Sequence, residues 1–197
     1  MIYGREILPP FFEIKQKKIN RNYNMACTPQ TFNGLARNCD ANSGGVRVVY
    51  IANRSDVATI SLTEDKIGTI TMADTKKFHA YNFKKGAASL TSTATIDPTT
   101  GANFITSVLS MQFAKMETTK RIEMSALTLA DMAVIVLDNN GKYWFLGYDN
   151  YAYASNATGE TGAQRTDANQ YTIEISDESE GFPYEVDPTI IADIIAA

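Results

Sequence analysis

The sequence predicts a mainly β protein, an antiparallel β-sandwich or a partly closed barrel with one flanking α-helix. The composition favours strands, because the chain holds ten tyrosines and nine phenylalanines and aromatic residues suit a pleated, packed surface. Short apolar or alternating segments are separated by clusters of Gly, Asn, Asp and Pro, which is typical of strands joined by turns. A single segment, residues 118–130, has apolar residues at helical spacing.

The strongest hairpin signal lies in residues 132–148, around which we expect the fold to be organised. An apolar run ends at Asp138, and a second segment follows that contains Trp144, the only tryptophan. Asn140-Gly141 between them favours the positive φ angles of a two-residue turn. We therefore predict two buried strands joined by a tight turn. Their predicted core side chains are Val134, Val136, Tyr143, Trp144 and Leu146.

Three shorter strands are expected before this hairpin. Residues 46–52 follow a glycine pair and are apolar on both faces, which is typical of a strand inside a sheet. Residues 67–72 and 78–83 each predict a short strand. The stretch 56–65 is mixed and is assigned to neither helix nor strand.

Residues 87–114 predict one long antiparallel hairpin. A Ser- and Thr-rich segment with period two is joined to a second alternating segment by the turn 97–101, where proline fixes φ and glycine takes the strained corner. The period then changes, and one amphipathic helix is expected over residues 118–130. Its predicted apolar face holds Ile122, Ala126, Leu129 and Ala130.

The C-terminal part predicts one more strand. Residues 156–162 are small and flexible and are expected to form a loop. Residues 171–176 alternate and predict the last strand of the sheet. We expect the acidic run 177–181 to end this strand at an edge that faces solvent. The apolar tail is expected to dock, either on its own core or on a neighbouring molecule.

Three regions are predicted: an N-terminal arm or extension (1–24), a single β domain (25–187) and a C-terminal tail (188–197). The arm contains prolines and a basic run, and it adds no core. It holds five basic and two acidic residues, so the rest of the chain has 13 basic and 20 acidic residues. Whether Met25 is the authentic start, and whether the arm reaches a neighbouring subunit, stay open.

The acidic balance disfavours a protein that grips nucleic-acid phosphates, because such a protein needs clustered Lys and Arg. Cys27 and Cys39 are the only cysteines, and they lack the second pair that a zinc site requires. Their redox state stays open between two thiols and a disulfide. No apolar stretch approaches the roughly 18 residues of a membrane-spanning helix.

The sequence shows no catalytic or cofactor-binding constellation. His79 is the only histidine, which removes the usual general base and the histidine-rich metal sites. No glycine-rich phosphate loop or nucleophile elbow is present. Residues 138–141 offer calcium-like oxygens, but the chain does not continue with the spacing of a twelve-residue calcium loop. We therefore predict that the protein is not an enzyme and holds no cofactor or metal.

Two motifs carry a resemblance to a known family. They are Asp-Asn-Asn-Gly-Lys-Tyr-Trp-Phe-Leu-Gly at 138–147 and Asp-Ala-Asn-Gln-Tyr-Thr at 167–172. Over about residues 25–187 the chain resembles tail tube proteins of tailed bacteriophages with Bacteroidetes-type hosts. It departs from that pattern at Gln170, where such proteins often carry glycine, and in the arm before Met25.

The resemblance implies a virion structural protein that assembles in the cytoplasm of the bacterial host. Its copies would form hexameric rings stacked into a tube, contact other tail proteins, and let DNA pass without specific binding. No membrane is involved. An acidic chain is compatible with such a conduit, because an acidic lumen repels phosphates. The loops expected to contact other subunits contain Lys84, Lys85, Asp97, Pro98, Thr99 and Gly101.

Two other interpretations stay open. A head-completion, decoration or baseplate protein of the same virion would share this composition. A carbohydrate-binding module or an enzyme is the alternative from another class, because clustered aromatic rings stack on sugars. Three or more rings along one exposed groove would favour sugar binding, whereas rings buried in the core would count against it. The rings concerned are Tyr143, Trp144, Tyr148, Tyr151 and Tyr153.

Overall fold

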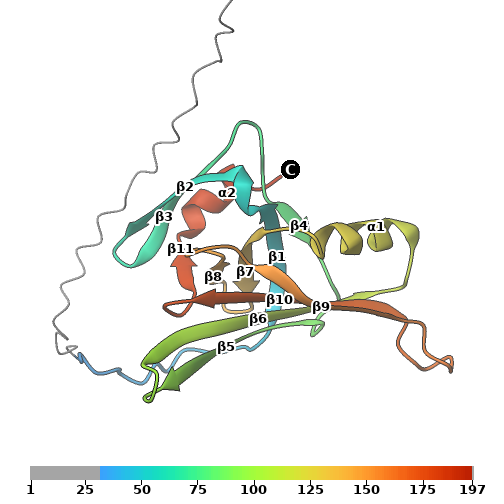
Figure 1. Cartoon of the computed structure of the whole chain (residues 1–197), viewed down its shortest axis with the longest axis horizontal. Coiled ribbons are helices and arrows are strands. Elements are labelled where there is room, and N and C mark those ends of the chain that lie inside the picture. The colour runs from blue at the N-terminus through green and yellow to red at the C-terminus, as the bar shows by residue number, and fades with distance from the viewer. Residues whose placement is uncertain (1–31, 197) are drawn as a thin grey trace, which may run out of the picture. The chain divides into compact units, whose positions relative to one another are not determined.

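The computed structural model describes residues 32–196, and both sheets lie in the unit that begins at Ala41. Half of the described residues are in strands (50%) and 12% are helical, which confirms the mainly β prediction. The strands form a seven-stranded and a four-stranded sheet, and neither closes into a barrel (Figure 1). Of the two predicted architectures, the β-sandwich with a flanking helix is therefore the one observed.

The seven-stranded sheet has the order β2-β3-β11-β8-β7-β1-β4, and the four-stranded sheet has the order β5-β6-β10-β9. All neighbouring strands are antiparallel except β11 and β3, which run parallel. The elements are β1 (Val46–Asn53), η1 (Arg54–Asp56), β2 (Val57–Thr63), β3 (Lys66–Met72), β4 (His79–Tyr81), β5 (Ala88–Asp97), β6 (Ala102–Ala114), α1 (Thr118–Leu127), β7 (Met132–Asp138), β8 (Tyr143–Leu146), β9 (Tyr153–Glu160), β10 (Gln170–Ser179), β11 (Tyr184–Val186), η2 (Pro188–Ile190) and α2 (Ile191–Ile194).

The core is split into two clusters by the seven-stranded sheet. The first cluster draws on β1, β7, β6 and β10 and fills the space between the sheets. The second lies on the other face of the seven-stranded sheet, under α2. Along β7, Val134 and Val136 enter the first cluster and Ala133 and Ile135 the second. Burial on both faces explains why this strand is an unbroken apolar run.

The predicted core residues of the central hairpin differ in burial. Val134, Val136 and Leu146 are fully buried. Tyr143 and Trp144 are only half-buried and pack against the edges of the two clusters. Each carries a polar group that gains from contact with water or with a hydrogen-bond partner, so partial exposure suits it.

The turn of this hairpin is longer than predicted. Only Gly141 of the Asn140-Gly141 pair has a positive φ, +80°, and β8 begins at Tyr143. The Asp138 carboxylate accepts hydrogen bonds from the Asn140 and Lys142 amides at 2.8 and 2.9 Å. An Asx-type turn therefore takes the place of the predicted two-residue turn. It is stabilised because the Asp138 side chain accepts hydrogen bonds from two backbone amides of the turn.

The helix is shorter than predicted, and its apolar face is different. α1 ends at Leu127, and the Thr128 amide closes it by donating to the Met124 carbonyl. Met124 and Leu127 are buried, whereas Ile122 is 56% exposed. The Tyr81 hydroxyl on β4 donates to Glu123. The helix therefore packs on the sandwich through Glu123, Met124 and Leu127. The flanking helix itself is confirmed. Its predicted apolar face was wrong, because Leu129 and Ala130, which lie outside the helix, were counted in its period.

Two further predictions about strands were wrong, and one stretch that the sequence left unassigned is a strand. The mixed stretch 56–65 contains β2, an edge strand whose side chains are mostly exposed and therefore show no apolar period. Residues 156–160 belong to β9 instead of a loop, because pairing with β10 compensates for their small side chains. The acidic run after residue 176 continues β10 to Ser179 in the middle of its sheet. The last strand is β11.

The C-terminal tail docks on its own domain. Ile191 and Ile194 of α2 are buried in the second cluster. The Phe78 amide donates to the Ile194 carbonyl, and the Phe78 carbonyl accepts from the Ala196 amide, both at 2.8 Å. The predicted arm (1–24), Met25 and Cys27 lie outside the described residues, and Cys39 is an exposed free thiol.

Candidate assembly surface

The four-stranded sheet has one face in the core and one face turned away from it. On β6 the side chains alternate, and one set is buried against the first cluster. Because paired residues of neighbouring strands point to the same side, the same alternation runs across β5 and β10. The buried set on β6 is Ile105, Ser107, Leu109, Met111 and Phe113.

Most side chains on the outer face of this sheet are polar, and Phe104, Val108 and Tyr153 are the larger exceptions on its rows. One row across it runs Ser89, Ser110, Glu174 and Asn156 on β5, β6, β10 and β9. A second row aligns Thr93 with Thr106 and Glu178. Such rows of Ser, Thr and Asn hydrate well and bury little apolar area. The face is therefore suited to water or to a polar surface.

The four strands of this sheet contain no Lys, Arg or His. Their side chains that carry charge at neutral pH are all carboxylates. Basic side chains neutralise nucleic-acid phosphates and provide most of the electrostatic affinity for them, and these strands lack such side chains. The carboxylates are Asp97, Glu160, Glu174, Asp177 and Glu178.

Both borders of the sheet are edge strands among the described residues. β5 pairs only with β6, and β9 pairs only with β10. The ten residues of β5 and the eight of β9 include no proline and no lysine, which are two common devices that blunt an edge strand. All of β9 except Ala154 is exposed. These edges are open to pairing with a strand of another molecule.

The loops predicted to contact other subunits lie at opposite ends of β5. Lys84 and Lys85 are exposed in the turn before β5, which Gly86 closes with a φ of +81°. The turn 97–101 joins β5 to β6 at the other end, and Gly101 has a φ of +75°. The structure therefore places the two loops on the same hairpin but does not bring them together.

Asp97 organises its turn. Its carboxylate accepts hydrogen bonds from the Thr100 hydroxyl and the Thr99 amide, both at 2.8 Å. These two hydrogen bonds, from Thr100 first, lower the pKa of Asp97. The group stays charged to lower pH than a free aspartate, so this end of the hairpin keeps a negative charge.

Asp177 was not singled out from the sequence, although it continues the alternation of residues 171–176 into the buried set. It is 2% exposed, and its Oδ1 has no hydrogen-bond partner. Burial raises its pKa most, the Gly147 amide opposes this by donating to it, and nearby Asp149 and Glu178 raise it further. A buried carboxylate with one oxygen unpartnered is costly, so Asp177 is an unfavourable group at the C-terminal end of β10.

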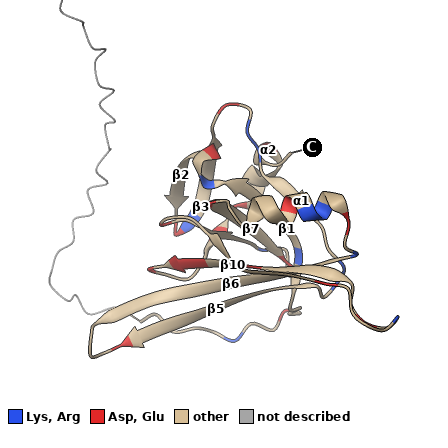
Figure 2. Cartoon of the chain, turned by 45° about the vertical axis from the view of Figure 1, so that its right-hand side comes forward, with Lys and Arg blue, Asp and Glu red and all other residues tan. Residues whose placement is uncertain are grey.

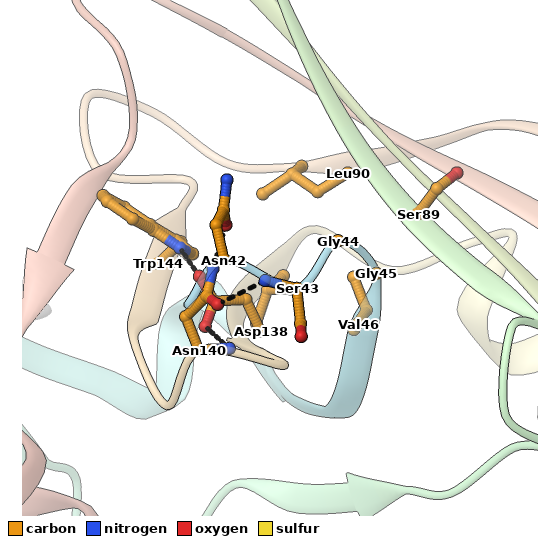
Figure 3. Close-up of a pocket in the computed structure, with 11 residues that line it drawn as sticks. Asn42, Ser43, Gly44, Gly45, Val46, Ser89, Leu90, Asp138, Asn140 and Trp144 are labelled. Atoms are coloured by element: carbon orange, nitrogen blue, oxygen red, sulfur yellow. Dashed lines mark hydrogen bonds between the residues drawn. The ribbon is translucent and has the colours of Figure 1, made fainter. Parts of the chain in front are cut away.

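The hollow beside the central turn holds about 240 Å³ (Figure 3). Its polar lining residues bond to one another: Asn140 accepts from the Ser43 amide at 2.8 Å and donates to Asn42 at 2.9 Å. The Trp144 indole donates to Asp138 Oδ2 at 3.0 Å. These bonds fasten the chain before β1 to the β7–β8 turn, so the residues have a structural role.

Metal coordination finds no support at this turn. Asp138 Oδ1 accepts from two amides and Oδ2 accepts from Trp144, so donors already occupy the carboxylate. Within residues 32–196, no three His, Cys, Asp or Glu side chains come together in a way that could hold a metal ion.

The five aromatic rings do not share one hollow in the described part of the chain. Trp144 lines the hollow of Figure 3, and Tyr148 lines a different, much smaller one, where its ring packs 4.7 Å from that of Tyr184. Tyr151 and Tyr153 are 38% exposed. This arrangement gives the sugar-binding interpretation no groove of stacked rings.

Comparisons with protein-family models, curated proteins and solved structures find no match to this chain. None of the described helices has the length and apolar character needed to span a membrane.

Proposed function

We propose that this protein is a self-assembling structural subunit of the tail tube type. In this proposal its copies pair through sheet edges into rings, the rings stack into a tube, and DNA passes through the lumen. The protein works as part of a virion and has no catalytic role. The observation that best supports this proposal is the four-stranded sheet. Both of its edges are open, and its strands hold no basic side chain.

The open edges support ring formation. A head-to-tail contact between β5 of one copy and β9 of the next would use two different edges of the same sheet, and contacts of this heterologous kind close into rings when the rotation allows it. Strand addition satisfies the backbone donors and acceptors that an edge exposes. The sheet would then continue from subunit to subunit.

The polar outer face supports the assignment of this sheet to the lumen. Each phosphate that a protein neutralises releases counterions and adds affinity. A lumen of Ser, Thr and Glu side chains provides none of these contacts, so DNA would slide along it without binding. The motifs at 138–147 and 167–172, which resemble those of tail tube proteins, point to the same function.

Electron microscopy of the purified full-length chain tests the proposal. We expect rings and tubes in negative stain at high protein concentration, and mass photometry should show a multiple of the chain mass. Monomers alone under all conditions would contradict the proposal. Closed rings that never stack would contradict the tube and favour a head-completion or other virion role.

Proline substitutions on β9 test whether assembly uses this edge strand. Amides of consecutive strand residues point to opposite sides, so one of Ala157→Pro and Thr158→Pro removes an amide from the open edge. We expect that variant to fold and to lose rings. Thr118→Pro is the matched control, because it falls at the first residue of α1 after Glu117, which is extended with φ −150° and ψ 162°. Proline is tolerated there, so the control should assemble.

A further inference from the structure

The two ends of the four-stranded sheet can be assigned from its pairing register. Ala88 on β5 pairs near the end of β6, and Gln170 at the start of β10 pairs with both Ala114 and Glu160. The residues before β5, after β6 and between β9 and β10 therefore lie at one end. The β5–β6 turn and the segment after β10 lie at the other end.

The first end is rich in exposed basic side chains. Lys84 and Lys85 precede β5, Lys115 follows β6, and Arg165 lies in the β9–β10 loop, all of them exposed. We call these four residues the basic end. Acidic groups are present here as well: Glu117 lies 3.7 Å from the Lys115 ammonium and 2.8 Å from that of Lys120. Glu160 and Asp167 also lie on this side. They are engaged locally, since Glu160 accepts from Gln170 and Asp167 from the Ala163 and Gln164 amides.

The second end is acidic. Asp97 lies at the β5–β6 turn, and Glu178 and Glu180 lie at the end of β10, where the Glu180 amide donates to Asp149 at 3.0 Å. We call these four residues the acidic end. Among the described residues, the basic Arg54 lies beside Asp149, because it donates to the Gly147 and Asn150 carbonyls. Figure 2 shows acidic colouring at the end of β10 and at the β5–β6 turn, and basic colouring at the far tip of the β9–β10 hairpin.

Exposed apolar side chains accompany the acidic end. Ile96 is 71% exposed, Phe182 is 62% exposed and Phe104 is 36% exposed. Phe104, Glu178 and Ser179 line one shallow hollow, and Ser179 and Phe182 line the next. Apolar groups surrounded by charge are typical of protein–protein contact surfaces. The acidic end therefore has the composition of an interface.

We infer that the basic end of one copy docks on the acidic end of the next, so that copies stack along the strand direction. The occupant of each end is a second copy of this chain, because one chain carries both members of the charge pair. The inference rests on the proposed assembly into rings and names the surfaces through which rings stack. Opposite charge sets the orientation and the order of stacking, while Ile96 and Phe182 add buried apolar area.

Charge reversal at each end tests the docking. Lys84→Glu with Lys85→Glu makes both ends acidic, and Glu178→Lys with Glu180→Lys makes both ends basic. Each double variant should form rings but lose tubes. The association constant of each end-to-end contact should fall at least about tenfold, which corresponds to about 1.4 kcal/mol per contact, and the mean stack length should fall with it. An equal mixture of the two double variants should recover long stacks, because unlike ends meet again. The chain with all four changes should also stack.

The outcomes separate this inference from the proposed function. Tubes of unchanged length in both double variants, or a mixture that does not recover stacking, would overturn the end-to-end docking while leaving ring formation intact. Wild-type protein that forms neither rings nor tubes would reject both. Lys84→Gln with Lys85→Gln is a milder check, expected to shorten stacks less than the Glu changes. Circular dichroism must show native signal for each variant that is scored.

Discussion

Gly147 is the position where a single methyl group should destabilise the fold most clearly. It follows β8 with a φ of +84°. A Cβ there would lie 2.7 Å from the Met132 carbonyl oxygen and 3.1 Å from the Ala152 nitrogen. These two atoms belong to a bridge in which Met132 and Ala152 exchange amide hydrogen bonds of 2.7 and 2.8 Å. The methyl group of Gly147→Ala therefore meets fixed backbone.

The expected cost has two parts. A left-handed conformation costs an L-residue about 1–2 kcal/mol, and disturbing the two bridge hydrogen bonds adds about 1 kcal/mol for each. We expect Gly147→Ala to lower the free energy of unfolding by about 3–4 kcal/mol. Gly86 is the matched control, with φ +81° and no atom within 4 Å of an added Cβ. Gly86→Ala should cost only the conformational part, about 1–2 kcal/mol.

Urea denaturation, followed by the fluorescence of the single tryptophan and by circular dichroism, measures both variants. With a denaturant slope of about 2 kcal/mol/M, the midpoint should fall by about 1.5–2 M for Gly147→Ala and by about 0.5–1 M for Gly86→Ala. The protein concentration is kept where the chain is monomeric, because assembly would stabilise the folded state. Equal midpoints for the two variants would refute the steric reasoning.

Three further predictions concern stability. Asp138→Ala removes the acceptor for two turn amides and for the Trp144 indole. The free energy of unfolding should therefore fall by about 3 kcal/mol, and the tryptophan emission should shift to the red. Unchanged emission and stability would contradict this role of Asp138. Asp177 has a folded pKa raised, chiefly by burial, above its ordinary value of 3.8, so its charged form disfavours folding and protonation relieves that cost. Asp177→Asn should therefore be more stable than wild type in urea melts at neutral pH, and the difference should close as pH falls through the raised pKa towards 3.8; a constant difference would reject the linkage. Ile191→Ala truncates a side chain that is 4% exposed in the second cluster and should cost about 3 kcal/mol, whereas Ile122→Ala at 56% exposure should stay within about 0.5 kcal/mol. Similar midpoints for the last pair would show that α2 does not cover the core.

The sequence predicted the parts of the fold in which local pattern and burial agree. The long hairpin was predicted over 87–114 and is β5 with β6, because each strand alternates with period two around a turn with a defined chemistry. β7 was predicted because burial on both faces leaves only apolar residues. β2 and β9 were missed because they are edge strands with mostly exposed side chains. Their pairing is set by the neighbouring strand and leaves no apolar period of their own.

The candidate surface was only partly predictable. The sequence indicated exposed loops at 84–86 and 97–101 but could not show that they lie at opposite ends of one strand, since that depends on the register with β6. The absence of basic residues from four strands becomes visible only once these strands are known to share one sheet. The buried Asp177 was masked by the acidic residues around it, which suggested a solvated terminus.

The β6–β10 pair shows how one stretch of sequence meets two requirements at once. In a strand, successive side chains point to opposite faces, so Ile173 and Ile175 fill the core while Glu174 and Glu178 on the same strand stay on the outer face. A register slip of one residue would bury the glutamates and expose the isoleucines. Core packing therefore fixes the strand register, and this register in turn determines where the polar face and the charged ends lie. The proposed assembly surface therefore needs no separate ordering step, because the packing of the two sheets already fixes the positions of its residues.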